Sequence, residues 1–233
     1  MDGKHQVLQE YFGYDAFRPG QGELIDALLA GRDAFGVMPT GGGKSLCYQV
    51  PALLLPGVTV VVSPLISLMQ DQVTALKKAG VAAAYLNSAL TQAQIDQVCR
   101  RLLAGEYRLL YVAPERLLAD RFLAVVQRLD IAMVAVDEAH CISQWGQDFR
   151  PSYLRILEFL GRLPRRPVVA AFTATATAQV REDVRRILAL RDPLEIVTGF
   201  DRPNLRFEVL HPKNKADALL VLVRDRGSRC GVV

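Results

Sequence analysis

The sequence predicts an α/β fold built on a mostly parallel sheet with helices on both faces. Apolar segments of strand length alternate along the chain with segments of helical periodicity, which is the pattern of a parallel sheet. Runs such as Val58–Val62 do not alternate with polar residues, so both faces of these strands should be covered. The 233 residues fit one large domain, or one domain and a piece of a second.

Seven strands and seven helices are expected in alternation. Short apolar runs predict strands at residues 33–37, 58–62, 82–86, 108–112, 131–136, 167–172 and 194–197. Helical spacing of apolar residues predicts helices at residues 20–29, 44–54, 65–79, 91–103, 114–129, 153–162 and 178–190.

The last part of the chain predicts the opening of a second domain. A strand-like run at residues 207–210, a turn at 211–215 and a helix at 216–224 precede an apolar run in which the chain stops. We therefore expect a first domain at residues 1–206 and the beginning of a second, incomplete domain at residues 207–233.

Composition excludes several classes of protein. With 28 Lys+Arg, 24 Asp+Glu and 51% hydrophobic residues, the chain has the balance of a folded domain rather than a disordered tail. No apolar stretch approaches the roughly 18 residues of a membrane helix, and the N-terminus lacks a signal segment. Four widely spaced cysteines predict single buried thiols, not disulfides or a zinc site. We expect a cytoplasmic protein without a membrane partner.

A glycine-rich segment predicts a phosphate-binding loop. It follows a predicted strand and opens a predicted helix, which is the context that such a loop requires. Its residues are Thr40, Gly41, Gly42, Gly43, Lys44 and Ser45. Backbone N–H groups would hold phosphate oxygens, Lys44 would reach the β- and γ-phosphates, and Ser45 would ligate Mg²⁺. The general pattern has glycine where this chain has Met38, and the alternative is a glycine-rich turn before an ordinary helix.

A pair of acids follows another buried strand. Six apolar residues run directly into Asp137 and Glu138, at the strand end where open α/β sheets place ligand chemistry. Asp137 would hold Mg²⁺ through water, and Glu138 would orient the attacking water. Alone, such a pair is usually a solvated helix start. Together with the glycine-rich loop, it predicts hydrolysis of a nucleoside triphosphate.

Several motifs occur in the order seen in RecQ DNA helicases of superfamily 2, which the chain resembles over essentially its whole length. The motifs are FRPGQ (residues 17–21), MPTGGGKS (38–45), VVSPLISLM (61–69), DEAHCISQWG (137–146), FTATAT (172–177) and FDRPN (200–204). The stretch 137–153 is the most specific, and MPTGGGKS, with Met38, is the form typical of this family. The resemblance implies a RecA-like P-loop NTPase lobe.

The resemblance also implies roles around the nucleotide. Arg18 and Gln21 match the motif that reads adenine, since a Gln amide presents a donor and an acceptor. Tyr14 would stack on the base, and His140 would complete the catalytic DEAH motif. The alternative for Arg18 and Gln21 is a helix N-terminus with solvated polar residues.

A further set of residues would contact DNA or couple it to the nucleotide. By resemblance, it consists of Ser63, Ser67, Gln144, Trp145, Asp148, Phe149, Arg150, Thr173, Thr175, Arg202 and Asn204. Aromatic faces and cations are the ingredients of single-strand binding, and five arginines follow from Arg150 to Arg166. The alternatives are a Trp packed under a solvated arginine face, helix capping by the serines, and a polar turn around Pro203.

The family function implied for the whole protein is that of a 3′→5′ DNA helicase of repair and recombination. It would use ATP and Mg²⁺, act on single-stranded or partly duplex DNA, and work in the bacterial cytoplasm or nucleoid. The second RecA-like lobe and C-terminal domains would be missing here, so this chain should hydrolyse ATP poorly and unwind nothing. From the residues alone, a P-loop phosphotransferase and a non-catalytic nucleic-acid-binding module remain alternatives.

Overall fold

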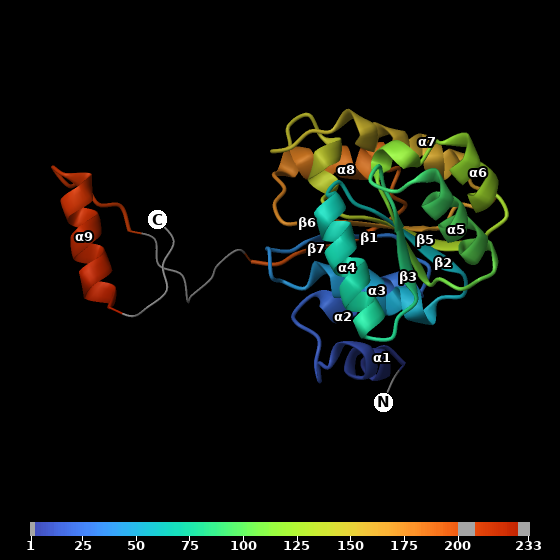
Figure 1. Cartoon of the computed structure of the whole chain (residues 1–233), viewed down its shortest axis with the longest axis horizontal. Coiled ribbons are helices and arrows are strands. Elements are labelled where there is room, and N and C mark those ends of the chain that lie inside the picture. Colours follow the sequence, from blue (N-terminus) through green and yellow to red (C-terminus); the bar gives the residue numbers. More distant parts are fainter. Residues whose placement is uncertain (1–2, 200–207, 228–233) are drawn as a thin grey trace. The chain divides into compact units, whose positions relative to one another are not determined.

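The computed structural model describes residues 3–199 and 208–227, which belong to two compact units divided after residue 200. The first unit contains a seven-stranded sheet in which every neighbouring pair of strands is parallel. The predicted α/β class is therefore confirmed (Figure 1).

The sheet has the order β3-β4-β2-β5-β6-β1-β7. Its strands are β1 (Ala34–Val37), β2 (Val58–Val62), β3 (Ala83–Leu86), β4 (Leu109–Val112), β5 (Ile131–Val136), β6 (Val168–Thr173) and β7 (Leu194–Val197). The six strands from β1 to β6 each have at most one residue that is not buried, as their apolar runs predict. Because all strands run in the same direction, their carboxyl ends form one edge of the sheet.

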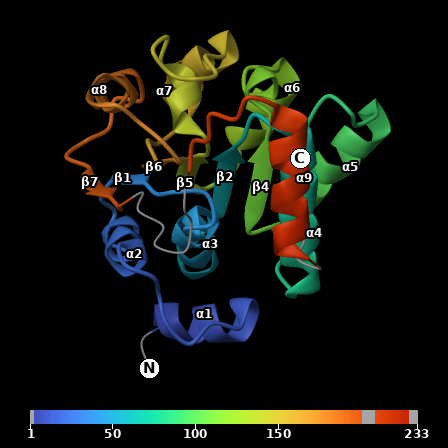
Figure 2. The same cartoon turned by 90° about the vertical axis from the view of Figure 1, so that its left-hand side faces the viewer.

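Helices cover both faces of the sheet (Figures 1 and 2). One face packs against α2 (Gln21–Leu29), α3 (Lys44–Leu54) and α4 (Ile66–Lys78), with α1 (Gly3–Phe12) lying outside α3. The other face packs against α5 (Gln92–Leu103), α6 (Asp120–Val126), α7 (Arg155–Arg162) and α8 (Ala178–Ile187). Single 3₁₀ turns stand at η1 (Pro114–Arg116), η2 (Ala139–Ile142) and η3 (Pro151–Leu154).

One predicted helix is wrong, and one helix was not predicted. Residues 114–129 are not a single helix but η1 and α6, because Ala119 is extended and the chain turns there to bury Leu117 fully. Helix α1 escaped prediction, although Val7 and Leu8 pack it against the core. Its short apolar face does not extend over the several turns that make a periodicity recognisable.

The second unit contains α9 (Lys215–Arg226), whose N-terminus is capped by the side chain of Asn214. The strand predicted at 207–210 is not formed over residues 208–210, and residue 207 lies outside the described part of the chain. A strand needs a neighbouring strand for its backbone hydrogen bonds, and the described residues of this unit supply none.

The described cysteines Cys47, Cys99 and Cys141 are buried free thiols, as their spacing predicts. Burial raises the pKa of Cys47 to about 12. Over residues 3–199 and 208–227, no three His, Cys, Asp or Glu side chains cluster in a way that could hold a metal ion. Nor does any helix within these ranges have the length and apolarity needed to cross a membrane.

Candidate active site

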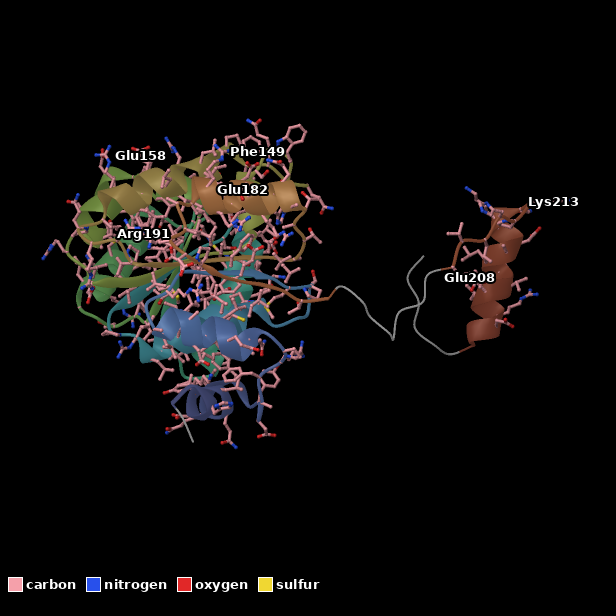
Figure 3. The ribbon with its side chains drawn as sticks, turned by 180° about the vertical axis from the view of Figure 1, so that it is seen from behind. Phe149, Glu158, Glu182, Arg191, Glu208 and Lys213 are labelled. Carbon is pink, nitrogen blue, oxygen red and sulfur yellow. The ribbon has the colours of Figure 1, made fainter. Side chains whose placement is uncertain are left out.

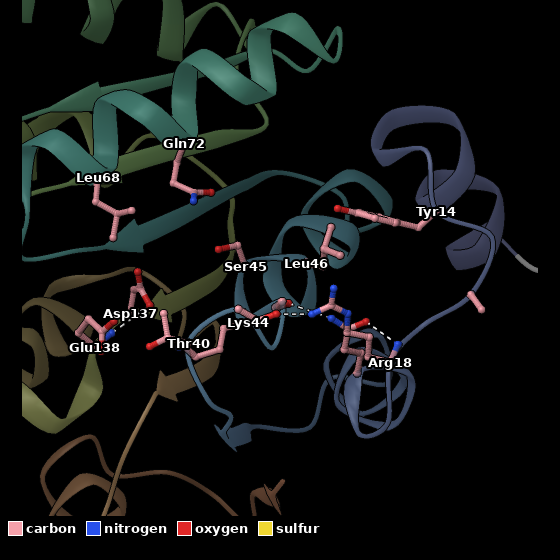
Figure 4. A pocket seen from close by; sticks show the side chains of 14 residues that line it. Tyr14, Arg18, Thr40, Lys44, Ser45, Leu46, Leu68, Gln72, Asp137 and Glu138 are labelled. Carbon is pink, nitrogen blue, oxygen red and sulfur yellow. Dashed lines mark hydrogen bonds between the residues drawn. The ribbon is translucent and has the colours of Figure 1, made fainter. Parts of the chain in front are cut away.

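A pocket of about 400 Å³ lies at the carboxyl edge of the sheet (Figure 4). Three chain segments bring their predicted site residues to it. Its lining includes Tyr14, Arg18, Gln21, Thr40, Gly41, Gly43, Lys44, Ser45, Asp137 and Glu138. Lys44 and Asp137 are 93 positions apart (137 − 44), yet both face this one pocket. The parallel sheet explains the meeting, because β1 and β5 both end at this edge.

The phosphate loop is held by its own backbone and by the neighbouring strand. Met38 N donates to the Thr173 carbonyl at 2.9 Å, and Gly42 N donates to the Pro39 carbonyl at 2.8 Å. The Lys44 ammonium donates to the Met38 carbonyl at 3.2 Å, which keeps the amine at the mouth of the loop. Lys44 is the first residue of α3, so the partial positive charge of the helix N-terminus adds to that of the amine.

Gln21 is buried and supports the phosphate loop. Its Oε1 accepts from Arg18 N at 2.8 Å, and its Nε2 donates to the carbonyls of Gly43 at 3.0 Å and Gly42 at 3.3 Å. The Arg18 guanidinium donates to the Gly41 carbonyl. The alternative of a solvated helix start is therefore wrong for Gln21, which is 1% exposed.

Gly43 has no room for a side chain. Its φ is +79°, and a Cβ atom would lie 2.4 Å from Gln21 Nε2. The side chains of Arg18 and Gln21 thus pack directly against the backbone of the phosphate loop. Tyr14, at 52% exposure, flanks the pocket with its ring free for a ligand to contact.

The two acids have different environments. Burial, and then the neighbouring charge of Glu138, raise the pKa of Asp137 to about 6. The backbone of Asp137 is fixed by the Tyr153 hydroxyl, which donates to its carbonyl at 2.9 Å. A hydrogen bond with His140 lowers the pKa of Glu138. Glu138 therefore stays a carboxylate at neutral pH, as a group that polarises water must.

His140 joins the acids to β6. Its Nδ1 lies 2.8 Å from the Thr173 hydroxyl oxygen and 3.3 Å from Glu138 Oε2. Hydrogen bonds with Cys141 and Glu138 raise the pKa of His140 to about 9. The Thr173 hydroxyl donates to the Thr175 carbonyl at 3.1 Å, so its oxygen accepts from a protonated His140. The backbone of Thr175, not its side chain, takes part in this network.

The loop after η2 carries the predicted aromatic residues. Trp145 is 74% exposed, Gln144 is exposed and Phe149 is half-buried. Trp145 is thus not packed in the core, and that alternative is wrong. Arg150 donates to the Pro64 carbonyl at 3.0 Å and pairs with Asp148 at 2.6 Å, which connects the loop to the start of α4.

The two predicted serines, Ser63 and Ser67, lie near the start of α4. Ser63 is buried, and no described residue bonds its hydroxyl, whereas Ser67 is exposed. The capping alternative is wrong, because Leu65 is the N-cap of α4 and makes no side-chain cap bond. Arg202 and Asn204 lie outside the described residues.

Of the four arginines that follow Arg150 up to residue 166, Arg165 and Arg166 do not belong to this surface. Arg166 pairs with the buried Asp33 at 2.6 Å, and Arg165 pairs with Asp130. Asp33 precedes β1 and Arg166 precedes β6, so this pair lies at the amino edge of the parallel sheet, opposite the pocket. Arg166 therefore does not add to the cations beside Trp145.

Sequence reasoning missed Ala16, Leu46, Leu68 and Gln72, which also line the pocket. Gln72 accepts from Gln49 at 2.8 Å, and Gln49 also donates to the buried Tyr111 hydroxyl at 3.0 Å. Leu68 and Gln72 stand one turn apart on α4, so they face the same way. No local pattern separates Gln72 from the other polar positions of this amphipathic helix.

Comparisons with known proteins identify the family of the chain. The family model described as DEAD/DEAH box helicase matches residues 18–184. The ATP-dependent DNA helicase RecQ of Bacillus subtilis (strain 168) is 46% identical over 97% of this chain and 39% of its own length. RecQ of Pasteurella multocida (strain Pm70) is 44% identical over 97% of this chain and 36% of its own length. The chain thus spans less than two fifths of these relatives.

Solved structures share the fold. A hypothetical ATP-dependent RNA helicase from Sulfolobus tokodaii superimposes with a TM-score of 0.64 at 22% identity, over 84% of this chain and 57% of its own. The DUF1998 helicase MrfA bound to DNA gives a TM-score of 0.66 at 17% identity, over 84% of this chain and 28% of its own.

Proposed function

Because this chain belongs to the DEAD/DEAH box helicase family, we propose that it is the first RecA-like lobe of a RecQ-type, ATP-dependent 3′→5′ DNA helicase. One observation carries the proposal. Lys44, Ser45, Asp137 and Glu138 line a single pocket, and Trp145 stands exposed only a few residues beyond Glu138. The two acids of the pocket and an exposed aromatic residue suited to nucleic acid are therefore parts of one short chain segment.

The residues of the pocket fit a magnesium–triphosphate. Ser45 and Asp137 present oxygen atoms, which Mg²⁺ prefers, beside the Lys44 ammonium. The buried Asp137 carboxylate has a raised pKa, so a cation near it would relieve an uncompensated negative charge. When bound, Mg²⁺ would neutralise charge on the phosphate oxygens.

The protein's own groups would do the rest. Lys44 and the backbone N–H groups of the loop would hold the β- and γ-phosphates, while Arg18, Gln21 and Tyr14 would hold the base. Glu138 would accept a proton from the water that attacks the γ-phosphorus atom. His140, hydrogen-bonded to Glu138 and Thr173, would orient that carboxylate.

DNA would bind beside the pocket, on the loop of Trp145 and Phe149 and on the start of α4. Stacking of a base on an exposed aromatic ring is worth about 1–3 kcal/mol and does not depend on sequence. Trp145 has the exposure that such stacking requires. Ser67 and Arg150 would contact phosphates, because a hydroxyl and a guanidinium can both donate to phosphate oxygens.

The whole helicase would need more than this chain. We place the first lobe at residues 1–206 and the start of the second lobe at residues 207–233. An arginine from a second lobe is worth about 10³–10⁵ in the rate of phosphoryl transfer. The 233-residue chain should therefore bind nucleotide, hydrolyse it slowly and separate no strands, whereas the complete protein would act on DNA in the bacterial cytoplasm or nucleoid.

The test measures ATP hydrolysis with and without single-stranded DNA in the complete protein. We expect DNA to stimulate phosphate release, and Glu138→Gln to reduce it by about 10²–10⁴ with nucleotide binding retained. Trp145→Ala should remove the stimulation by DNA and leave the affinity for ATP unchanged. Tyr14→Ala should weaken the affinity for ATP and leave the stimulation by DNA unchanged. Transfer of phosphate to a small molecule instead of water would contradict the proposal, as would DNA binding without any hydrolysis.

A further inference from the structure

The exposed Trp145 is carried by a tightly bonded turn. Ser143 directly follows η2, and its hydroxyl oxygen accepts from Trp145 N at 3.1 Å, while Ser143 O accepts from Gly146 N at 2.9 Å. A Cβ atom on Gly146 would lie 2.3 Å from the His140 carbonyl oxygen, so the turn folds back directly onto η2. The exposed ring therefore stands on a backbone that has little freedom.

The same turn is bonded to helix α8. The Ser143 hydroxyl donates to Asp183 Oδ2 at 2.7 Å, and Asp183 Oδ1 accepts from Arg186 at 3.1 Å. Ser143 is fully buried and Asp183 is 7% exposed. A serine hydroxyl has one hydrogen, and an ionised carboxylate can only accept. The Ser143 hydrogen must therefore point to Asp183, which leaves an oxygen lone pair for Trp145 N.

Helix α8, which carries Asp183, is itself held firmly in the fold. Val180 and Val184 bury one side of it in the core, and the Thr177 side chain caps its N-terminus by accepting from Val180 N at 3.3 Å. The chain between Glu138 and Trp145 is also braced. Cys141 N donates to the Glu138 carbonyl at 2.9 Å, and Ser143 N donates to the His140 carbonyl at 3.2 Å.

We infer that Asp183 is a positioning residue that, through the Ser143 hydroxyl, fixes the backbone of Trp145 relative to Glu138. This inference rests on the proposed function, in which the ligand of Trp145 is a stacked base of single-stranded DNA. A base that moved a firmly held ring would also move the backbone near Glu138. A base that moved a loosely held ring would leave the backbone near Glu138 in place. Both the affinity for DNA and the effect of DNA on hydrolysis would therefore depend on the hydrogen bond between Ser143 and Asp183.

The chain offers a direct measurement, because Trp145 is its only tryptophan. Its fluorescence anisotropy in the folded 233-residue chain reports the motion of this ring alone. We expect Ser143→Ala and Asp183→Ala to lower that anisotropy. Asp183→Asn keeps a carbonyl oxygen that can accept from Ser143, and it should keep most of the anisotropy.

Glu182 provides a matched control. It is the preceding acid on α8, exposed and paired with Arg185, and Figure 3 shows it on the outside of the helix. Glu182→Ala removes the same charge from the same helix and should leave the anisotropy of Trp145 unchanged. A residue that only stabilised α8 would lower the melting temperature without changing the anisotropy of the folded protein.

A second measurement adds oligo(dT). Quenching of Trp145 should show an affinity about tenfold weaker in Ser143→Ala and Asp183→Ala than in wild type and Glu182→Ala. If wild type shows no response to oligo(dT), the proposed DNA site is wrong while the anisotropy still decides the anchor. Ser143→Ala removes only one oxygen atom, so it provides a test even if Asp183→Ala fails to fold. An unchanged anisotropy of Trp145 in Ser143→Ala would overturn the inference.

Discussion

The imidazole Nδ1 of His140 lies 2.8 Å from the hydroxyl oxygen of Thr173, and this contact joins the end of β5 to the end of β6 beside Glu138. The two residues are 33 positions apart in the chain. Thr173 also accepts Met38 N through its carbonyl, so the same residue touches the phosphate loop. One buried threonine therefore connects the phosphate loop to His140 and η2.

Thr173→Val should test this link, because valine keeps the shape of threonine and removes the hydroxyl. We expect a loss of about 1 kcal/mol in the free energy of unfolding from the missing hydrogen bond. Stimulation of ATP hydrolysis by DNA should fall about fivefold or more. Urea denaturation and phosphate-release assays measure the two effects. Thr175→Val should cost less, since only its carbonyl takes part; equal losses in the two variants would argue against the network described here.

Gly43→Ala should impair the phosphate loop through a clash as well as through backbone strain. An alanine at φ +79° costs about 1–2 kcal/mol, and its Cβ would displace the Gln21 amide. Gly31→Ala is the matched control, because Gly31 has the same φ of +79° and open space around it. Both variants should lose similar stability from strain. Only Gly43→Ala should lose nucleotide affinity, by about tenfold or more, in a titration with a fluorescent ATP analogue.

Arg166→Ala should reduce stability without affecting the nucleotide pocket. It leaves the Asp33 carboxylate, 2% exposed, without its cation, and breaking such a buried pair costs about 3 kcal/mol. Arg165→Ala breaks the exposed pair with Asp130 and should cost less than about 1 kcal/mol. Urea midpoints give both numbers. A loss of ATP affinity in folded Arg166→Ala would contradict its position at the opposite edge of the sheet.

Asp183 should make stability depend on pH in the acid range. Hydrogen bonds from Ser143 and Arg186 lower the pKa of its carboxyl group. A lowered pKa means that the folded state favours the charged form. The stabilisation is therefore complete above the unfolded pKa of about 4, and it is lost as the pH falls through the folded pKa. The difference in urea midpoint between wild type and Asp183→Asn should be largest near pH 7 and shrink steadily below pH 4; a constant difference would rule out this linkage.

The phosphate loop and the Asp137–Glu138 pair could be read from the sequence because their signals are local. Each is a short motif between an apolar strand and a helix, and parallel topology then brings both to one edge of the sheet. The partner of Arg166 could not be read in this way. Asp33 lies 133 positions earlier, and only the register of β1 beside β6 brings the two together.

The burial of Gln21 and the structure of residues 114–129 also could not be read from the sequence, because both depend on contacts with other segments. Gln21 has the appearance of a solvated helix start, and its burial depends on how the phosphate loop packs over it. The break between η1 and α6 depends on the burial of Leu117 against the core, which overrides the helical periodicity of the segment. Pairwise contacts between distant segments decide these features, whereas periodicity records only which face is apolar.

Glu138 lies in the left-handed backbone region, with φ 48° and ψ 47°, which glycine and asparagine adopt at lower energy. Such a conformation costs a glutamate about 1–2 kcal/mol. Ala189 and Asp192 share a positive φ, but of the three residues only Glu138 lines the pocket. Under the proposed role of Glu138, exchange for glycine would relieve this strain and remove the carboxylate together, so a more stable fold and a lost activity would come from the same substitution.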